Sequence, residues 1–347
     1  GFEMYALASN LAKHGTYANP FLVLATGPSA SNPPLYPLLL ALIMKVFRVP
    51  ALVLLAAAVL NIFANALTAA WLPRVSWLFF GDVGPGIVAS VFWLLAFQLM
   101  PSWDANLTLA ALLFFCLFSS RTVASKNYVY FGVTSGIIAG ALFLLNPSSL
   151  LIFLPWLAYL SMFGSAPFKQ TVVYGCIVLA AAALVVFPWV LRNDRQLGAF
   201  VMRTNLGITL YASNNDCASP SLIETEQSGC YETYHPNDSM KQAEALRDMG
   251  EVKNDRQRIE DTKAWVTAHP GPFLRLTMAR FRDFWFPRMV EHPLKIVVVW
   301  IVTILSIPGI ALMAYRRERV TAFVLFVLTV YPLMYYVVVS DVRYRYP

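Results

Sequence analysis

Hydrophobic residues fill long, nearly uninterrupted runs along most of this chain. These runs lie at about 51–72, 84–100, 106–120, 128–146, 148–163, 171–190, 294–314 and 320–340. A helix rises about 1.5 Å per residue and the hydrocarbon core of a bilayer is about 30 Å thick, so apolar runs approaching 20 residues are typical of transmembrane helices. The pattern predicts an all-α polytopic membrane protein, a transmembrane helix bundle with eight spans.

One further apolar run is too short for this role. Residues 35–47 lie within "SNPPLYPLLLALIMKVFRVP", where Pro33 and Pro34 precede the run and Arg48 and Pro50 follow it. As a helix the run reaches only about 20 Å, which is short of the hydrocarbon thickness. We interpret it as an interfacial helix lying along the outer leaflet. The alternative is a short, tilted span.

Polar residues are concentrated in one block. Of the 45 Asp, Glu, Lys and Arg residues, 26 lie between residues 191 and 290, although 58% of the chain is hydrophobic. We interpret this block as an external soluble module, mainly helical. The net charge of +7 comes from the rest of the chain. Without a basic tract among aromatic residues, this charge indicates membrane orientation and argues against a nucleic-acid partner.

Basic residues between the runs define an orientation. Short connections that carry Lys or Arg face the cytoplasm. An interfacial 35–47 places these basic residues on one side: Arg74, Arg121, Lys126, Lys169, Arg316, Arg317 and Arg319. Lys45 and Arg48 are the exception, because they would lie outside at the headgroups. The predicted regions are a first external loop (1–50), transmembrane helices (51–190), the external module (191–290), and transmembrane helices with an external tail (291–347). We expect the chain to be truncated at both ends.

Two cysteines fall in the external module and two fall in predicted spans. Cys217 and Cys230 share the module, where a disulfide fits an oxidising compartment. Two free or metal-binding thiols are the alternative. Cys116 and Cys176 are expected to be packing residues.

Two carboxylates border the predicted outer face. Glu3 is the only acid in the first external loop, and Asp104 lies in the loop "MPSWDAN". A pair of carboxylates at a wet cleft can deprotonate an acceptor or hold a divalent metal ion against phosphate. Each can also be an ordinary solvated loop residue.

Several segments in order resemble a known group. They are "EMYALASNLAKHGTY", "GPSASNPPLYPLLLALIMKVF", "PWVLRNDRQLGAFVMRTNLGITLYASNN", "AWVTAHPGPFLRLTMARFRDFWFP" and "DVRYRYP". Together they resemble the bacterial membrane glycosyltransferases of the C-type superfamily, near the protein-mannosyltransferase and aminoarabinose-transferase-like families. The resemblance covers most of the chain and implies a bundle with interfacial helices in the first external loop.

The resemblance also implies roles for particular residues. Tyr5, Pro33, Pro34 and Tyr36 would wall a cavity at the outer leaflet, and Glu3 and Asp104 would be catalytic or hold a metal ion. Arg343 and Arg345 match the "RYR" pattern of the family and would bind the donor phosphate; anchoring of a span end is the alternative. The family usually keeps an Asp early in the first loop. Glu3 stands there in this sequence; the alternative is that the usual Asp lies upstream of residue 1.

The expected function is transfer of a sugar from a polyprenyl-phosphate donor to a glycan, lipid or protein acceptor. The expected location is the inner membrane, with the active face toward the periplasm. The expected partner, besides the substrates, is the lipid bilayer. Direct displacement predicts inversion at the anomeric carbon. Two alternatives remain open. The chain could bind lipid-linked glycans or a partner without catalysis, or it could be a flippase. Transporters tend to have internal repeats and charged residues deep within their spans, and this sequence shows neither feature.

Overall fold

The computed structural model describes residues 2–96, 103–288, 293–339 and 341, and helices make up nearly all of its regular structure. Within these ranges, five helices are long and apolar enough to cross a membrane. They are α3 (Pro50–Phe80), α5 (Ala105–Thr122), α6 (Tyr128–Leu145), α8 (Phe168–Leu197) and α15 (Pro293–Tyr315). The prediction of an all-α polytopic membrane protein is therefore confirmed.

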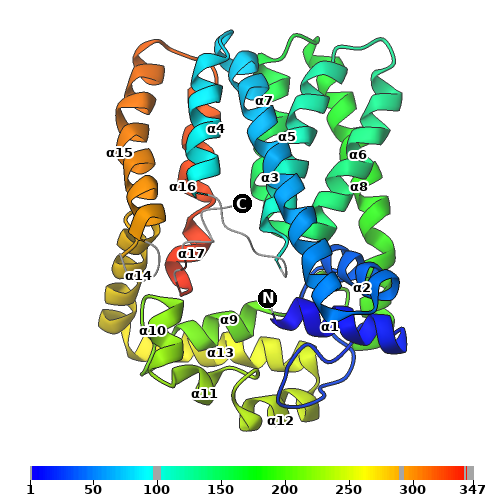
Figure 1. The fold of residues 1–347 in the computed structure, drawn as a ribbon, viewed down its shortest axis with the longest axis vertical. Coiled ribbons are helices and arrows are strands. Elements are labelled where there is room, and N and C mark those ends of the chain that lie inside the picture. Colours follow the sequence, from blue (N-terminus) through cyan, green and yellow to red (C-terminus); the bar gives the residue numbers. More distant parts are fainter. Residues whose placement is uncertain (1, 97–102, 289–292, 340, 342–347) are drawn as a thin grey trace.

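Shorter apolar helices complete the bundle (Figure 1). They are α4 (Gly84–Ala96), α7 (Leu150–Phe163) after the 3₁₀ turn η1 (Pro147–Ser149), α16 (Thr321–Val330) and α17 (Leu333–Val337). The predicted span 320–340 is thus divided at Pro332, which has no amide hydrogen to continue the helix. The predicted span 84–100 ends outside the described residues.

Two predicted spans end too early. The run predicted at 171–190 continues to Leu197 in α8, so the first residues assigned to the external module belong to this helix. The run predicted at 51–72 continues to Phe80, so Arg74 lies inside α3 and not in a connection. Pro73 does not stop this helix, which ends where Gly81 takes a left-handed conformation (φ 65°) and donates its amide hydrogen to Trp77 O. A glycine in this conformation is the usual C-terminal cap of a helix.

The two ends of the bundle differ in chemistry. Figure 1 shows the connections α3–α4, α5–α6, α7–α8 and α15–α16 at one end, and α1 (Phe2–His14), α2 (Leu35–Phe47) and the charged module at the other. The basic residues Arg121, Lys126 and Lys169 therefore share the end opposite the module. This arrangement agrees with the alternation that the sequence predicted.

The short helix α2 packs beside α1 at the module end of the bundle, where α3 begins. Tyr36, Leu40 and Ala41 of α2 form a buried cluster with Met4 and Ala8 of α1, and Ala57 of α3 and Leu145 of α6 complete it. The helix spans 35–47 as predicted, and α3 starts three residues after it ends.

Helices α6 and α8 approach closely through small residues. Gly132, Gly136 and Gly140 repeat every four residues along α6, and a Cβ added at Gly136 would lie 2.5 Å from the Cβ of Ala181 and 2.6 Å from Val178 O. Small residues at this spacing let the backbones of transmembrane helices touch. The same pair of helices contributes Ala139, Leu142, Tyr174 and Val178 to the main buried core.

The charged module forms a helical layer across one end of the bundle. It contains α9 (Leu206–Ser213), α10 (Leu222–Gln227), α11 (Cys230–Tyr234), α12 (Met240–Met249), α13 (Glu251–Ala268) and α14 (Pro270–Trp285). In the structure Cys217 and Cys230 are joined by a disulfide, with their Cα atoms 5.7 Å apart. Cys116 and Cys176 are free thiols.

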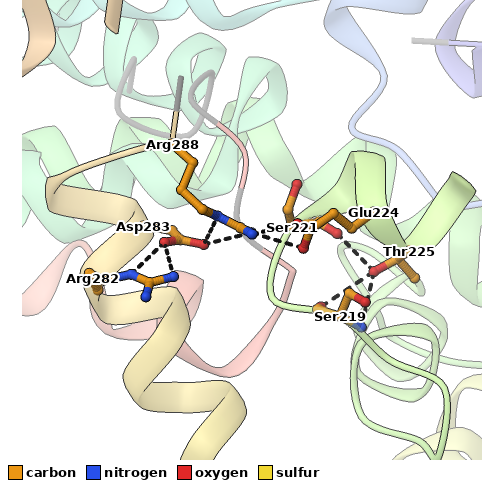
Figure 2. A network of polar contacts seen from close by, with 7 residues as sticks. All are labelled: Ser219, Ser221, Glu224, Thr225, Arg282, Asp283 and Arg288. Atoms are coloured by element: carbon orange, nitrogen blue, oxygen red, sulfur yellow. Dashed lines mark hydrogen bonds and ion pairs between the residues drawn. The ribbon is translucent and has the colours of Figure 1, made fainter. Parts of the chain in front are cut away.

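An ion-pair network fixes the segment that leads from the module back to the membrane (Figure 2). Arg288 donates from Nη2 to Glu224 Oε2 (2.8 Å) and from Nε to Asp283 Oδ2 (3.1 Å). Arg282 donates to the other oxygen of Asp283 (2.9 Å). Two cations and two carboxylates balance one another, so we interpret this network as structural, tying the end of α14 to α10.

Candidate functional site

The first external loop is held by residues 29–32, which are buried between the bundle and the module. Arg192, near the end of α8, donates to Ser29 O (2.6 Å) and to Tyr17 O (2.7 Å). Arg203 donates from Nε to Ser31 O (2.7 Å), and the Tyr17 hydroxyl donates to Asn32 O (3.0 Å). The carbonyl groups of Ser29, Ser31 and Asn32 are therefore satisfied by side chains, and Ala30 O accepts from the Thr204 amide (3.1 Å).

Glu251, the first residue of α13, binds the same segment. Its carboxylate accepts from Ser29 Oγ (3.1 Å), from the Ala30 amide (3.2 Å) and from Thr204 Oγ1. Burial raises the pKa of this carboxyl to about 7, against the opposing effects of these hydrogen bonds and of Arg192. Sequence reasoning missed Glu251 because it is one of many acids in a charged module. Only the fold reveals its partners.

Glu3 lies in the first turn of α1 and faces the module. Asn32 Nδ2 donates to its Oε2 (3.2 Å), Asn237 Nδ2 donates to its Oε1 (3.4 Å), and His235 Nε2 lies 3.7 Å from Oε1. His235 Nδ1 accepts from the Asn237 amide (3.2 Å), so a neutral His235 carries its proton on Nε2, toward Glu3. Burial lowers the pKa of His235, which favours this neutral form.

Asp104 precedes α5 at the module end of the bundle and is 2% exposed. Thr108 Oγ1 donates to its Oδ2 (3.4 Å), and the side chain of Asn146 also hydrogen-bonds the carboxylate. Burial raises the pKa of Asp104 to about 6, while the positive charge of Arg203 and these hydrogen bonds oppose the rise. A carboxyl group with a pKa near neutrality can both accept and release a proton under physiological conditions.

A chain of amide and phenol groups lies next to Asp104. Asn106 Nδ2 donates to Asn61 Oδ1 (2.9 Å), and Asn61 Nδ2 donates to the Tyr36 hydroxyl (3.1 Å). The charge of Asp104 acts on Tyr36 and on Tyr331, so both phenols lie within its electrostatic reach. Tyr36 thus reaches this group from α2, and its predicted role as a cavity wall stays a prediction.

Arg203 is the exposed member of this group. Its charge acts on Asp104, and it forms no ion pair with a carboxylate in the described part of the chain. Sequence reasoning left this arginine without a role, although it stands in the quoted segment "VMRTNLG". Its proximity to an acid 99 positions earlier in the chain could not be seen without the fold.

The other predicted site residues lie in different places. Pro33 and Pro34 are buried at the start of α2, where Pro33 O accepts from the Tyr17 hydroxyl (3.2 Å). Tyr5 lines a separate cavity beside Lys13. Arg343 and Arg345 lie outside the described residues, so their predicted role in binding phosphate stays a prediction.

The predicted pairing of Glu3 with Asp104 has no support from contacts. Among the residues that the structure describes, no hydrogen bond or ion pair joins the two carboxylates, and each has its own set of partners. The same ranges hold no cluster of three His, Cys, Asp or Glu side chains suited to a metal ion. We therefore derive no step through a metal ion.

Comparison with known proteins adds no family assignment. No family model, curated protein or solved structure matches this chain. The argument for function accordingly rests on the geometry around Asp104 and Arg203.

Proposed function

We propose that this protein is a membrane glycosyltransferase that moves a sugar from a polyprenyl-phosphate donor to an acceptor on the periplasmic side of the inner membrane. The observation that carries the proposal is the buried Asp104 at the junction of bundle and module, where the charge of the exposed Arg203 acts on its carboxylate. A lipid-linked donor reaches such a junction with its tail in the bilayer and its head in the aqueous layer. The order of sequence segments described above points to the same reaction.

Asp104 is the proposed base. Its pKa of about 6 leaves most of it ionised at neutral pH while keeping it basic enough to take a proton. It accepts a proton from the acceptor hydroxyl or amine, and the acceptor oxygen or nitrogen forms a bond to the anomeric carbon. The bond from that carbon to the phosphate oxygen breaks, polyprenyl phosphate leaves with the electron pair, and the configuration inverts.

Arg203 is the proposed phosphate-binding group. A guanidinium presents donors in a fork that matches phosphate oxygens, and it stabilises the negative charge that develops as polyprenyl phosphate leaves. Its Nε donates to Ser31 O, which leaves the two Nη groups to donate to a ligand. Arg343 and Arg345 would add to this group if the tail reaches it.

Glu3 is assigned a positioning role in this proposal. Its two oxygens accept hydrogen bonds from Asn32 and Asn237, so it links α1 and the start of α2 to the module and sets the wall of the site.

The second candidate function is binding of a lipid-linked glycan without transfer. The low exposure of Asp104 favours this candidate, because a carboxylate that is 2% exposed offers little access to an acceptor.

The test uses the purified chain in nanodiscs with a panel of polyprenyl-phosphate monosaccharides and a periplasmic extract as the acceptor source. Release of polyprenyl phosphate is followed by mass spectrometry, since this product is common to all donors. Asp104→Asn should lower release by roughly 10²–10⁴ with donor binding retained, and Arg203→Gln should weaken donor binding. Asp82→Asn, at the opposite end of the bundle, is the matched control and should keep full activity.

Three outcomes separate the candidates. Donor-dependent release that is lost in Asp104→Asn supports the transferase. Tight binding of donor with no release in any combination supports the non-catalytic candidate. Full release by Asp104→Asn removes this residue as the base and returns the role to Glu3.

A further inference from the structure

A cavity of about 520 Å³ lies between α1, the C-terminal part of α2 and the first turn of α3. Three cationic side chains line it, one from the last turn of α1 and two from the end of α2: Lys13, Lys45 and Arg48. Met44 and Val53 supply apolar wall, and Tyr5 adds a phenol. Its lining contains no carboxylate.

The three cations form no ion pair with a carboxylate in the described part of the chain. Their ordinary structural role would be to neutralise the negative ends of α1 and α2. Each helix end carries only about half an elementary charge, whereas the cavity gathers three full positive charges. A net positive charge therefore remains for a ligand.

The end of α2 is built to place Arg48 at this cavity. Arg48 takes a left-handed conformation (φ 55°), and its amide donates to Met44 O (3.1 Å). This conformation turns the chain so that Pro50 starts α3 two residues later. A non-glycine residue in this region of backbone space carries a cost, which the capping hydrogen bond offsets in part.

The surroundings of the cavity are those of a membrane surface. Val46 is 65% exposed and Leu52 44%, both beside the point where the long apolar helix α3 begins. Exposed apolar residues at the start of a transmembrane helix are covered by lipid. The cavity consequently lies at the level of the headgroups, on the module side, where the positive-inside rule gives no reason for a group of cations.

We propose that this cavity binds the phosphate of an anionic phospholipid whose headgroup carries no amine. The three cations receive the phosphate, and the acyl chains lie along the exposed apolar face of α2 and α3. A zwitterionic headgroup fits less well, because its ammonium would enter a cavity that already holds three positive charges. Tyr36 belongs to the proposed catalytic site. It lies about 14 Å from Lys45 along α2, since an α-helix rises about 1.5 Å per residue. The lipid site is thus separate from the proposed donor site and does not depend on the proposed reaction.

Native mass spectrometry of the purified chain provides the test. The chain is titrated with phosphatidylglycerol, with phosphatidylethanolamine and with soluble glycerol phosphate. We expect phosphatidylglycerol to bind roughly tenfold more tightly than phosphatidylethanolamine, and glycerol phosphate to bind much more weakly than either. The triple variant Lys13→Gln/Lys45→Gln/Arg48→Gln should lose the preference between the two lipids. Lys241→Gln/Lys253→Gln/Arg256→Gln removes the same charge from exposed positions in the module and should keep it.

A second variant guards against misfolding of the triple variant. Ser9→Leu keeps every charge and fills part of the cavity, so it should lower the binding of phosphatidylglycerol several-fold. Equal binding of the two lipids by the parent chain overturns the proposal, as does unchanged phosphatidylglycerol binding in both cavity variants. Glycerol phosphate that binds as tightly as the lipid would identify a site for free phosphate in place of a lipid site.

Discussion

The carboxylate of Glu251 accepts a hydrogen bond from the Ser29 hydroxyl at 3.1 Å, although 222 positions of the chain separate the two residues. This contact joins the module to the first external loop. Because Ser31 and Asn32 bind Arg203 and Glu3, the same contact also sets the position of both groups at the proposed site.

The first prediction concerns the pH dependence of stability. The pKa of Glu251 is about 7 in the folded protein, above its ordinary value, so the folded state binds this proton more tightly than the unfolded state does. The resulting stabilisation is fully present below about pH 4.5 and is lost as the pH rises through 7. Glu251→Gln has no carboxyl to titrate here, so its stability does not fall in this way. The difference in free energy of unfolding between Glu251→Gln and the parent should therefore shift by about 2–3 kcal/mol in favour of the variant between pH 5 and pH 8.

Thermal unfolding at several pH values in detergent measures this difference. Asp104 has a raised pKa as well and contributes a change of the same sign, but it is present in both proteins and cancels in the comparison. Glu244→Gln, an exposed position on α12, is the control and should run parallel to the parent. If the stability of Glu251→Gln follows that of the parent at every pH, Glu251 does not have the raised pKa described here.

The second prediction concerns the contact between α6 and α8. Gly136→Ala places a Cβ within 2.5 Å of the Ala181 Cβ, which forces the helices apart and should cost roughly 1–3 kcal/mol of stability. Gly175→Ala on α8 is the matched control, because a Cβ there meets nothing within 4 Å. Equal melting temperatures of the two variants would show that the helices do not pack as described.

The third prediction concerns the disulfide. Alkylation of the denatured chain without reductant should modify only Cys116 and Cys176, because Cys217 and Cys230 are bonded. Loss of the bridge should cost the module on the order of 3 kcal/mol, the chain-entropy value for a loop of this size. Four modified thiols in the intact mass would exclude the bridge.

The fourth prediction concerns orientation. In a background with Cys116→Ala and Cys176→Ala, an impermeant thiol reagent should label Leu22→Cys and Val49→Cys from the same side of the membrane. Both positions are at least half exposed, and they flank α2. Met162→Cys, at the far end of α7, should be labelled from the opposite side. Labelling of positions 22 and 49 from opposite sides would make α2 a membrane span.

The sequence predicted much of the fold because apolar length and the placement of Lys and Arg are local signals. The bounds of α2 and the positions of the eight apolar helical segments followed from them. The continuation of α3 past Pro73 did not, because a proline within a helix is tolerated in some membrane helices and ends others.

The candidate site was predicted only in part. Asp104 and Tyr36 could be selected because acids are scarce outside the module and because Tyr36 follows the two prolines. Arg203 and Glu251 stand among many charged residues, and their partners are far away in the chain, so no local pattern distinguishes them. The pairing of Glu3 with Asp104 was inferred from their shared face, and a shared face does not establish contact.

The most direct measurement for the central claim is mass analysis of cell-envelope glycans, lipids and proteins from cells with and without this protein. We predict that one component loses the mass of a single sugar in the absence of the protein, while the polyprenyl-phosphate-linked form of that sugar accumulates. The parent protein should restore the modification, and Asp104→Asn, produced at the same level, should not. An envelope whose glycans, lipids and proteins are unchanged in mass, with no accumulation of a lipid-linked sugar, would contradict the proposed transfer.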